Sequence, residues 1–330
     1  MHNQGIIFFE RTFPSANMVL IKDEKPTLID TGFGSDIEET ASLIENAGVN
    51  IEDLHLIVNT HYHSDHVGGN YYLQKQYGTP IAAHHWDGKL INRLDREIGS
   101  ATYLDQPIEP YTVSKMLTDG DEINTGKHTF QVIHTPGHTL GHISLYNQEA
   151  EVLITGDLFH RDDVGWLNIF REGVSAINRS IESLQHLQQL SIKEAYSGHG
   201  PKIDNPKQSI QRAIDRFERW VENPKSIGWH ACKRVYAYTL IIENGMHKDD
   251  IEEYLLGCPW YHDFSRYIFQ ESPEQFVESL INEMIRSHAA EWKGDMLMAT
   301  APYDIADPSW MKQNIKPEDW HQIYSFESQS

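Results

Sequence analysis

The chain has 330 residues and a formal net charge of −21 at pH 7, from 27 Lys and Arg against 48 Asp and Glu. Proteins that bind phosphate backbones rely on concentrated Lys and Arg, so this balance and the lack of a basic run disfavour nucleic-acid binding. Hydrophobic residues make up 39% of the chain without Gly/Ser, Pro or Gln tracts, which indicates an ordinary globular protein.

The sequence favours a soluble, cytoplasmic protein that does not enter a membrane. Its start, MHNQGIIFFERTF, lacks a basic segment followed by a long apolar one, and no stretch approaches ~18 uninterrupted apolar residues. Cys232 and Cys258 form no CxxC motif, so neither a disulfide framework nor a cysteine zinc site is expected. The length exceeds the ~100–200 residues of one domain, which predicts a large catalytic domain and a smaller one.

Three short apolar runs open the chain and predict strands of a sheet: GIIFF, NMVLI and PTLID. A helix follows, capped by Ser35 or Asp36 and reaching about Ala47. The next run, LHLIV, is apolar apart from His55 and predicts a strand buried on both faces. After it the sequence predicts a helix over 67–77, a strand at TPIAAH, a helix over about 86–94 and an irregular stretch at 97–117.

Strands and helices continue to alternate up to about residue 222. The stretches HTFQVIHTPGHTLGHISLYN and EVLITGD predict three strands. Apolar residues at helical spacing predict an amphipathic helix over 172–189, and IKEAYSGHG predicts a strand that ends at a histidine between glycines. Asn205 and Pro206 begin a helix that reaches Glu222.

The segment ENPKSIG, residues 222–228, predicts a domain boundary. It ends a helix, contains Pro224 and precedes a change to an almost entirely helical pattern. The predicted domains are therefore 1–224 and 225–330. In the second we expect helices near 231–243, 248–256 and 273–288, then a hairpin at WKGDMLMATAPY and a tail.

The stretch THYHSDHVGG places three histidines and a carboxylate directly after the apolar run LHLIV. Histidines at i and i+2 can direct two imidazoles at one ion, so His61 and His63 would serve one metal. Asp65 and His66 would serve another. Surface loops also collect polar residues, but a loop after a buried strand has rigid support.

Further candidate ligands follow apolar runs downstream. These are His138 in TPGHTLGH, Asp157 in TGDLF and His199 in YSGHGP. Glycines beside them let the backbone turn tightly next to an ion: Gly137, Gly156, Gly198 and Gly200.

Taken together, these motifs resemble those of the metallo-β-lactamase-fold hydrolase superfamily, in its glyoxalase II and lactonase-like branch. The resemblance covers about residues 5–210. It rests on DTG at 30–32, HYHSDH at 61–66, PGHTLGH at 136–142, GDLF at 156–159 and GHG at 198–200. It implies an α+β fold, a four-layer αβ/βα sandwich, followed here by a small helical, winged-helix-like C-terminal domain.

The resemblance also implies the role of each motif residue. Carried over position by position, it gives a first metal held by His61, His63 and His138, a second held by Asp65, His66 and His199, and Asp157 as the bridging carboxylate. Asp30 matches a position that supports the site from behind the ligands. His142 matches a motif position that is not normally a ligand.

Two divalent metal ions are therefore the expected cofactors. The His and carboxylate ligands favour Zn, although Fe or Mn accept the same set. A metal pair ~3.5–4 Å apart can lower the pKa of bound water from about 15.7 to about 7. We expect the resulting hydroxide to attack an ester, thioester or lactone carbonyl of a small-molecule substrate. Asp65 or Asp157 would move the proton as the catalytic residues.

Two other functions fit the same ligands. One is a metal-dependent phosphodiesterase or nuclease, which the missing basic patches disfavour. The other is a ligand-binding regulator with vestigial hydrolase activity, which seven intact ligands disfavour. A true β-lactamase is disfavoured by Asp65 and Asp157, because those enzymes usually lack the bridging carboxylate.

Residues 229–300 resemble the winged-helix-like domain of a subgroup of these hydrolases. Winged helices often bind DNA, but residues 225–330 carry 9 Lys and Arg against 17 Asp and Glu, a net charge of −8. We therefore expect a lid, a pocket wall or a contact within a homodimer. The Lys/Arg pattern that would bind glutathione is not recognisable there.

The loop after Asp157 carries three further candidates. His160 lies where a side chain can reach a substrate, whereas Trp166 and Phe170 can line a pocket or pack in the core.

Overall fold

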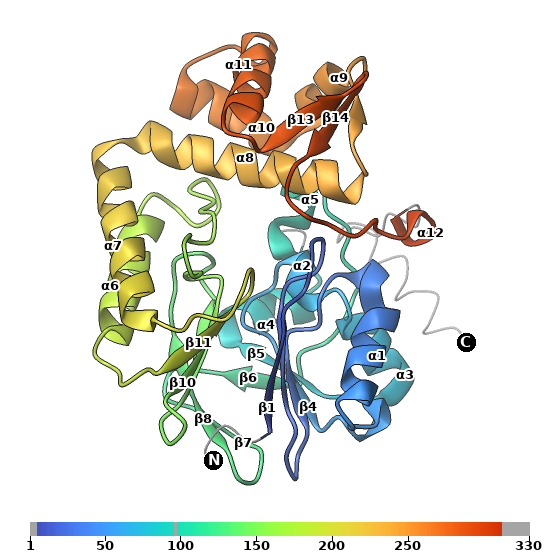
Figure 1. Ribbon diagram of the computed structural model, residues 1–330, viewed down its shortest axis with the longest axis vertical. Helices are drawn as coiled ribbons and strands as arrows, with labels where there is room; N and C mark the ends of the chain where they lie inside the picture. Colours follow the sequence, from blue (N-terminus) through green and yellow to red (C-terminus); the bar gives the residue numbers. More distant parts are fainter. Residues whose placement is uncertain (1–4, 96–97, 312–330) are drawn as a thin grey trace.

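The structure, a computed structural model, describes residues 5–95 and 98–311. Two β-sheets pack against each other and helices cover both outer faces, which gives four layers (Figure 1). This is the α+β sandwich that the sequence predicted.

The first sheet has six strands in the order β1-β2-β3-β4-β5-β6. Strands β1 to β3 pair antiparallel, and β3 to β6 pair parallel. The strands are β1 (Ile6–Phe9), β2 (Met18–Ile21), β3 (Thr27–Ile29), β4 (Leu56–Val58), β5 (Ile81–His84) and β6 (Lys115–Leu117).

The helices beside this sheet bury one apolar face on it. Ile44, Leu73 and Ile91, from three different helices, are fully buried in one cluster with Leu20 and Ile57 of the sheet. The helical elements are η1 (Gly34–Asp36), α1 (Ile37–Asn46), η2 (Ile51–Asp53), α2 (Ser64–Val67), α3 (Asn70–Tyr77), α4 (His85–Asn92), η3 (Ile98–Ser100) and α5 (Ala101–Leu104).

The second sheet has five strands in the order β11-β10-β9-β8-β7, with only β10 and β11 pairing parallel. Leu184, Ile210 and Phe217 from two helices pack on its outer face beside Leu153. The elements are β7 (Glu122–Asn124), β8 (Thr129–His134), β9 (Ile143–Asn147), β10 (Val152–Gly156), α6 (Ala176–Leu187), β11 (Glu194–Ser197) and α7 (Pro206–Glu222).

The core between the sheets follows from the alternation of side chains along each strand. Val19 of β2 and Val58 of β4 point inward and meet Phe130 and Leu145 of the second sheet. Leu20, one residue after Val19, points outward to the helices instead. Both faces of β2 are thus buried, which explains its unbroken apolar run.

Helix α8 (Pro224–Ile242) crosses the sandwich, and the remaining elements lie on its far side (Figure 1). A small sheet of order β12-β14-β13 joins them in a winged-helix-like arrangement. The elements are β12 (Met246–His247), α9 (Ile251–Gly257), α10 (Pro259–Asp263), the π-helix η4 (Phe264–Phe269), α11 (Pro273–Arg286), β13 (Ala290–Lys293), β14 (Met296–Ala299) and α12 (Pro308–Met311).

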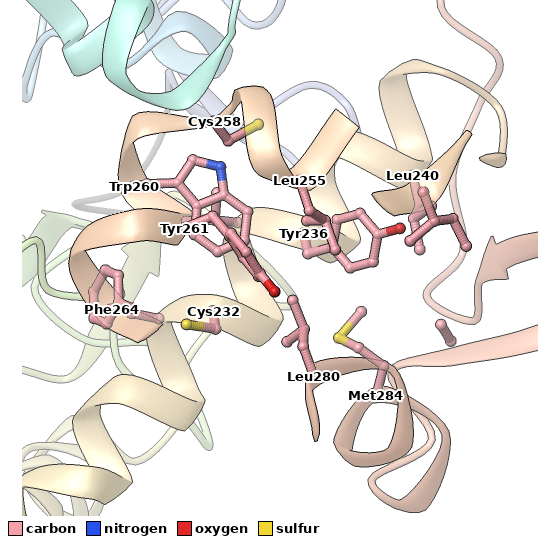
Figure 2. Packing of buried hydrophobic residues seen from close by; sticks show 14 of the residues in the cluster. Cys232, Tyr236, Leu240, Leu255, Cys258, Trp260, Tyr261, Phe264, Leu280 and Met284 are labelled. Carbon is pink, nitrogen blue, oxygen red and sulfur yellow. The ribbon is translucent and has the colours of Figure 1, made fainter. Parts of the chain in front are cut away.

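An apolar core lies between α8 and the elements that follow it. Figure 2 shows Trp260 and Tyr261 packed near Tyr236 of α8. Both cysteines, Cys232 and Cys258, are buried there as free thiols. The same cluster includes Tyr103 and Leu104 of the preceding part of the chain, so the division into 1–224 and 225–330 stays a prediction. The tail beyond residue 311 lies outside the described residues.

Three predicted boundaries are wrong. The helix expected from Glu172 begins at Ala176, because Gly173 has a φ of 80° that a helix does not allow. The helix expected from 231 begins at Pro224, a proline at its first turn. The stretch 97–117 contains β6, whose first two residues are exposed and leave no apolar run to recognise.

Among the described residues, no helix combines the length and apolar character needed to cross a membrane.

Candidate metal centre

The seven predicted ligands come together where strands of both sheets end. His61 and His63 follow β4, and Asp157 follows β10. The others lie on α2, on the turn between β8 and β9 and directly after β11: Asp65, His66, His138 and His199. Five are buried, while Asp65 and His199 are partly exposed and line a cavity.

Three histidine nitrogens converge on one point. Nδ1 of His63 lies 2.8 Å from Nε2 of His138 and 3.1 Å from Nε2 of His61. The two Nε2 atoms of His61 and His138 are 3.2 Å apart. A neutral imidazole has only one N–H, so three nitrogens this close are better satisfied by a shared cation than by each other.

A second group forms beside the first. Nε2 of His199 lies 3.1 Å from Oδ2 of Asp65, and Nε2 of His66 lies 3.9 Å from the same oxygen. The ligand atoms of these three residues are all within 4.8 Å of one another, as are those of the His61, His63 and His138 group.

Asp157 lies between the two groups. Its Oδ2 is 3.5 Å from Nε2 of His199 and 3.8 Å from Nε2 of His138, which belong to different groups. Its Oδ1 is 3.4 Å from Nε2 of His66. Both Oδ1 of Asp157 and Nε2 of His66 are buried without a hydrogen-bond partner among the described residues. Buried polar atoms are rarely left unpaired, so these two atoms fit a metal ion.

A glycine makes the close approach of these groups possible. A Cβ placed on Gly198 would lie 2.1 Å from Oδ1 of Asp157 and 2.5 Å from Cε1 of His66. The backbone after β11 therefore presses directly against the ligand atoms.

Hydrogen bonds behind the ligands fix which nitrogen faces the centre. Nδ1 of His138 donates to the carbonyl oxygen of Trp166 at 2.7 Å, which leaves Nε2 as the free nitrogen. Nδ1 of His66 donates to Oδ2 of Asp30 at 2.8 Å. Asp30 in turn accepts from the backbone N–H and hydroxyl of Thr60. Such partners orient metal-binding imidazoles, as expected for Asp30.

His142 is a support and not a ligand. Its Nε2 accepts the backbone N–H of Asp157 at 3.0 Å, and its Nδ1 lies 2.9 Å from the hydroxyl of Thr135. Both ring nitrogens are therefore used within the protein, which agrees with the sequence expectation.

The three converging histidines are neutral. Burial and the neighbouring histidines lower the pKa of His61 well below its usual value, and burial followed by His138 lowers the pKa of His63 to about 3. Burial also lowers the pKa of His138, against the opposing charge of Asp157. Neutral imidazole is the form that binds a metal ion.

In the second group, the pKa values of the histidines are raised instead of lowered. Burial alone would lower the pKa of His199, but Asp157 and Asp65 raise it to about 9. The same two carboxylates raise the pKa of His66 above its usual value against burial. Burial would raise the pKa of Asp157, but His199 and His66 lower it well below its usual range. The carboxylates thus attract positive charge, which protons or a divalent cation can supply.

A cavity of about 330 Å³ opens above this centre. His160 and Trp166, both singled out in the sequence, line it. Phe170 does not, because its ring packs against Phe264 with centroids 5.0 Å apart.

No residue of α8 was predicted to belong to the site. Yet α8 contributes one wall of the cavity: Arg234, Val235, Ala237, Tyr238 and Ile241. A pocket wall was among the roles expected for the C-terminal region, but its helical spacing alone gave no sign of which face would meet the metals.

Comparisons with known proteins agree with this geometry. The model of the metallo-beta-lactamase superfamily matches residues 11–199. A "probable metallo-hydrolase" of Methanocaldococcus jannaschii is 30% identical over 187 residues, 56% of this chain and 88% of that protein. A hydroxyacylglutathione hydrolase of Pelagibacter ubique is 30% identical over 166 residues, 50% of this chain and 60% of that protein.

Solved structures share the fold. A metallo-beta-lactamase family protein of Thermus thermophilus superposes with a TM-score of 0.59 at 16% identity, over 90% of this chain and 99% of that one. The family match, the hydrolase names of the relatives and the clustered His and Asp side chains together support a metal-dependent hydrolase. The chain belongs to the metallo-beta-lactamase superfamily.

Proposed function

We propose that the chain is a dinuclear hydrolase that cleaves an ester, thioester or lactone bond in a small molecule. One ion would be held by His61, His63 and His138, the other by Asp65, His66 and His199, with Asp157 shared between them. The His-rich ligand set favours Zn.

The position of Asp157 carries the proposal. Its Oδ2 lies within 4 Å of a nitrogen from each group, and its Oδ1 faces the unpartnered Nε2 of His66. A carboxylate in that position can bind two ions at once, whereas a site for a single ion would need no such bridge. Paired divalent ions supply Lewis acidity and lower the pKa of bound water to about 7.

The side chains around the centre can handle the proton and the substrate. Asp65 lines the cavity, and its Oδ2 lies 3.1 Å from Nε2 of His199, so this carboxylate can take a proton from a nucleophilic water beside the metal ions. Trp166 stacks on His63 with ring centroids 5.9 Å apart and fixes that imidazole. Apolar side chains of Leu104, Val235 and Ile241 line the cavity and limit access of water.

Among the three carbonyl substrates, a thioester is supported by the name of one relative. The relative named hydroxyacylglutathione hydrolase acts, by its name, on a glutathione thioester. Glutathione itself is not proposed here, because the Lys/Arg pattern that would bind it is not recognisable in the C-terminal region.

The content of bound metal tests the centre directly. We expect about two equivalents of Zn per chain in the wild type, and a lower content in Asp157→Ala. Asp204→Ala is the matched control, because Asp204 is exposed and pairs only with Lys202 among the described residues. Equal metal content in Asp157→Ala and the wild type would refute the shared carboxylate.

A substrate panel tests the reaction. Metal-loaded protein would be assayed with acyl thioesters, lactones, bis(p-nitrophenyl) phosphate and RNA. Turnover of thioesters or lactones supports the proposal, and turnover of phosphodiesters alone would replace it with a phosphodiesterase or nuclease. Turnover of none, with metal bound, would favour a ligand-binding regulator.

A further inference from the structure

Helix α8 brings a guanidinium group to the cavity. Arg234 lines the cavity together with Tyr238 and Ile241, which lie one and two turns further along the same face of α8. Burial lowers the pKa of Arg234 and the charge of Asp157 opposes that shift. A guanidinium remains protonated in proteins, so Arg234 places a positive charge beside the substrate space.

The charge of Arg234 is only partly neutralised. It donates to Oδ2 of Asp163, but Oδ1 of Asp163 already accepts from Arg216 and lies 3.3 Å from Nε2 of His230. Burial, then Arg216 and Lys233, lower the pKa of His230 to about 3, so His230 is neutral. Two guanidinium groups therefore share one carboxylate.

The same excess of positive charge extends along the loop beside the cavity. Arg161 and Arg212 both pair with Asp162, at 2.6 and 3.3 Å. Four guanidinium groups thus share two carboxylates, and two of the four, Arg161 and Arg234, line the cavity. Asp65 and Asp157 also line it but are assigned to the metal ions, so the charges left for a substrate favour an anionic ligand.

A second polar side chain borders the same cavity. His160 lines it, and its Nδ1 is buried without a hydrogen-bond partner among the described residues. Its ring lies 5.6 Å from that of His199, which places His160 next to the metal centre. A polar nitrogen that is buried without a partner is costly, and a ligand bound beside His160 can complete its hydrogen bonding.

We propose that Arg234 and His160 form an anion subsite beside the metal centre, which binds a carboxylate or phosphate that belongs to the substrate but not to the bond that is cleaved. The inference rests on the proposed hydrolase function and narrows its substrates to thioesters or esters with a negatively charged end. Arg234 supplies a planar donor group suited to either anion. Leu104, Val235 and Ala301 would contact the apolar part of the substrate between that end and the carbonyl.

Paired substrates test the subsite. The succinyl and butanoyl thioesters of N-acetylcysteamine differ in a terminal carboxylate, and butanoyl-coenzyme A carries phosphates on the leaving group instead. We expect the wild-type kcat/KM to be higher for one of the two anionic substrates than for the neutral butanoyl thioester. A preference for the succinyl thioester would place the anion on the acyl group, and a preference for butanoyl-coenzyme A would place it on the leaving group. In Arg234→Met that ratio should fall by about 10- to 100-fold, the range of a charged hydrogen bond.

The control variant is Arg219→Met, which removes a guanidinium from the exposed face of α7. Its substrate ratio should equal that of the wild type. A ratio near one in the wild type, or a ratio unchanged in Arg234→Met, would overturn the anion subsite while leaving the hydrolase function intact.

A binding measurement makes the subsite testable without turnover. Succinate and monomethyl succinate each offer one carboxylate to the metals, but only succinate has a second one for Arg234. Calorimetric titration of the metal-loaded protein should give a Kd for succinate about 10-fold or more below that for the monomethyl ester, and Arg234→Met should remove the difference. If the protein hydrolyses nothing, this result still decides the subsite, and equal Kd values in the wild type would refute it.

Discussion

Nδ1 of His66 lies 2.8 Å from Oδ2 of Asp30, and this hydrogen bond turns Nε2 of His66 toward Asp157. Asp30 is itself held by two hydrogen bonds from Thr60 and has a left-handed φ of 59°. Asn tolerates that conformation and can keep a similar shape, but it lacks the negative charge that strengthens the imidazole as a ligand.

We therefore expect Asp30→Asn to fold and to bind Zn about 10- to 100-fold more weakly than the wild type. Competition with a chromophoric chelator gives the Zn affinity, and circular dichroism checks the fold. The control is Asp204→Asn, at an exposed site away from the centre. A Zn affinity equal to that of the wild type would mean that Asp30 has only a structural role.

A methyl group on Gly198 should disrupt the centre. The added Cβ of Gly198→Ala would lie 2.1 Å from Oδ1 of Asp157, so the ligands or the backbone after β11 must move. We expect Gly198→Ala to lose metal and to be destabilised by about 1–3 kcal/mol, the usual cost of overpacking. Metal analysis and urea unfolding measure the two effects.

Gly257→Ala is the matched control for this substitution. A Cβ at Gly257, the last residue of α9, would meet nothing within 4 Å outside its own helix, and its φ is not left-handed. It should keep both the metal content and the free energy of unfolding of the wild type. Equal behaviour of the two variants would show that the backbone at Gly198 adapts freely.

The ligands could be predicted from the sequence because each lies in a short motif directly after an apolar strand. In THYHSDH, the spacing of the histidines and the aspartate along the chain is enough to predict that their side chains bind metal ions together. The Arg234–Asp163 contact joins residues 71 positions apart and carries no such motif. Only the packing of α8 over the cavity brings the two together. The cavity wall formed by α8 could therefore not be predicted from the sequence, whereas His160 and Trp166 on the loop after Asp157 could.

Some strands of the fold could likewise be predicted from the sequence and others could not. Strands with buried apolar runs, such as β2 and β10, were recognised, since burial of all their side chains leaves a plain signal. Strand β6 was missed because its pairing with β5 depends on backbone hydrogen bonds, and only Leu117 of its residues is buried.

Removal of metal should destabilise the sandwich. A bound ion stabilises the folded state by RT ln(1 + [L]/Kd), about 4 kcal/mol at 1,000 times Kd. We expect a chelator to lower the Tm of the wild type and to have a smaller effect on Asp157→Ala. Differential scanning calorimetry with and without added Zn measures both, and a Tm of the wild type independent of Zn would contradict the centre.

A buried acid on the loop that leads to α6 should make stability depend on pH. Burial raises the pKa of Glu172 to about 7, despite opposing contacts from the Leu140 backbone, Arg179 and Tyr62. Its Oε2 has no hydrogen-bond partner among the described residues. Burial and then Glu172 also raise the pKa of Asp87. Neither side-chain oxygen of Asp87 has a hydrogen-bond partner among the described residues.

The sign of the effect follows from proton uptake. Between the ordinary pKa of 4.5 and about 7, unfolded Glu172 is ionised while folded Glu172 keeps its proton. The folded state then binds more protons, so stability falls as pH rises through this window. The full shift of the pKa corresponds to about 3 kcal/mol.

Glu172→Gln keeps the shape of the side chain and removes its ionisation, so its stability should exceed that of the wild type progressively from pH 5 to pH 7. Urea unfolding at several pH values measures the difference, which should level off near pH 8. Glu182→Gln, at an exposed position on α6, should instead give a curve parallel to that of the wild type. A parallel curve for Glu172→Gln would mean that Glu172 is ionised in the folded protein throughout this range.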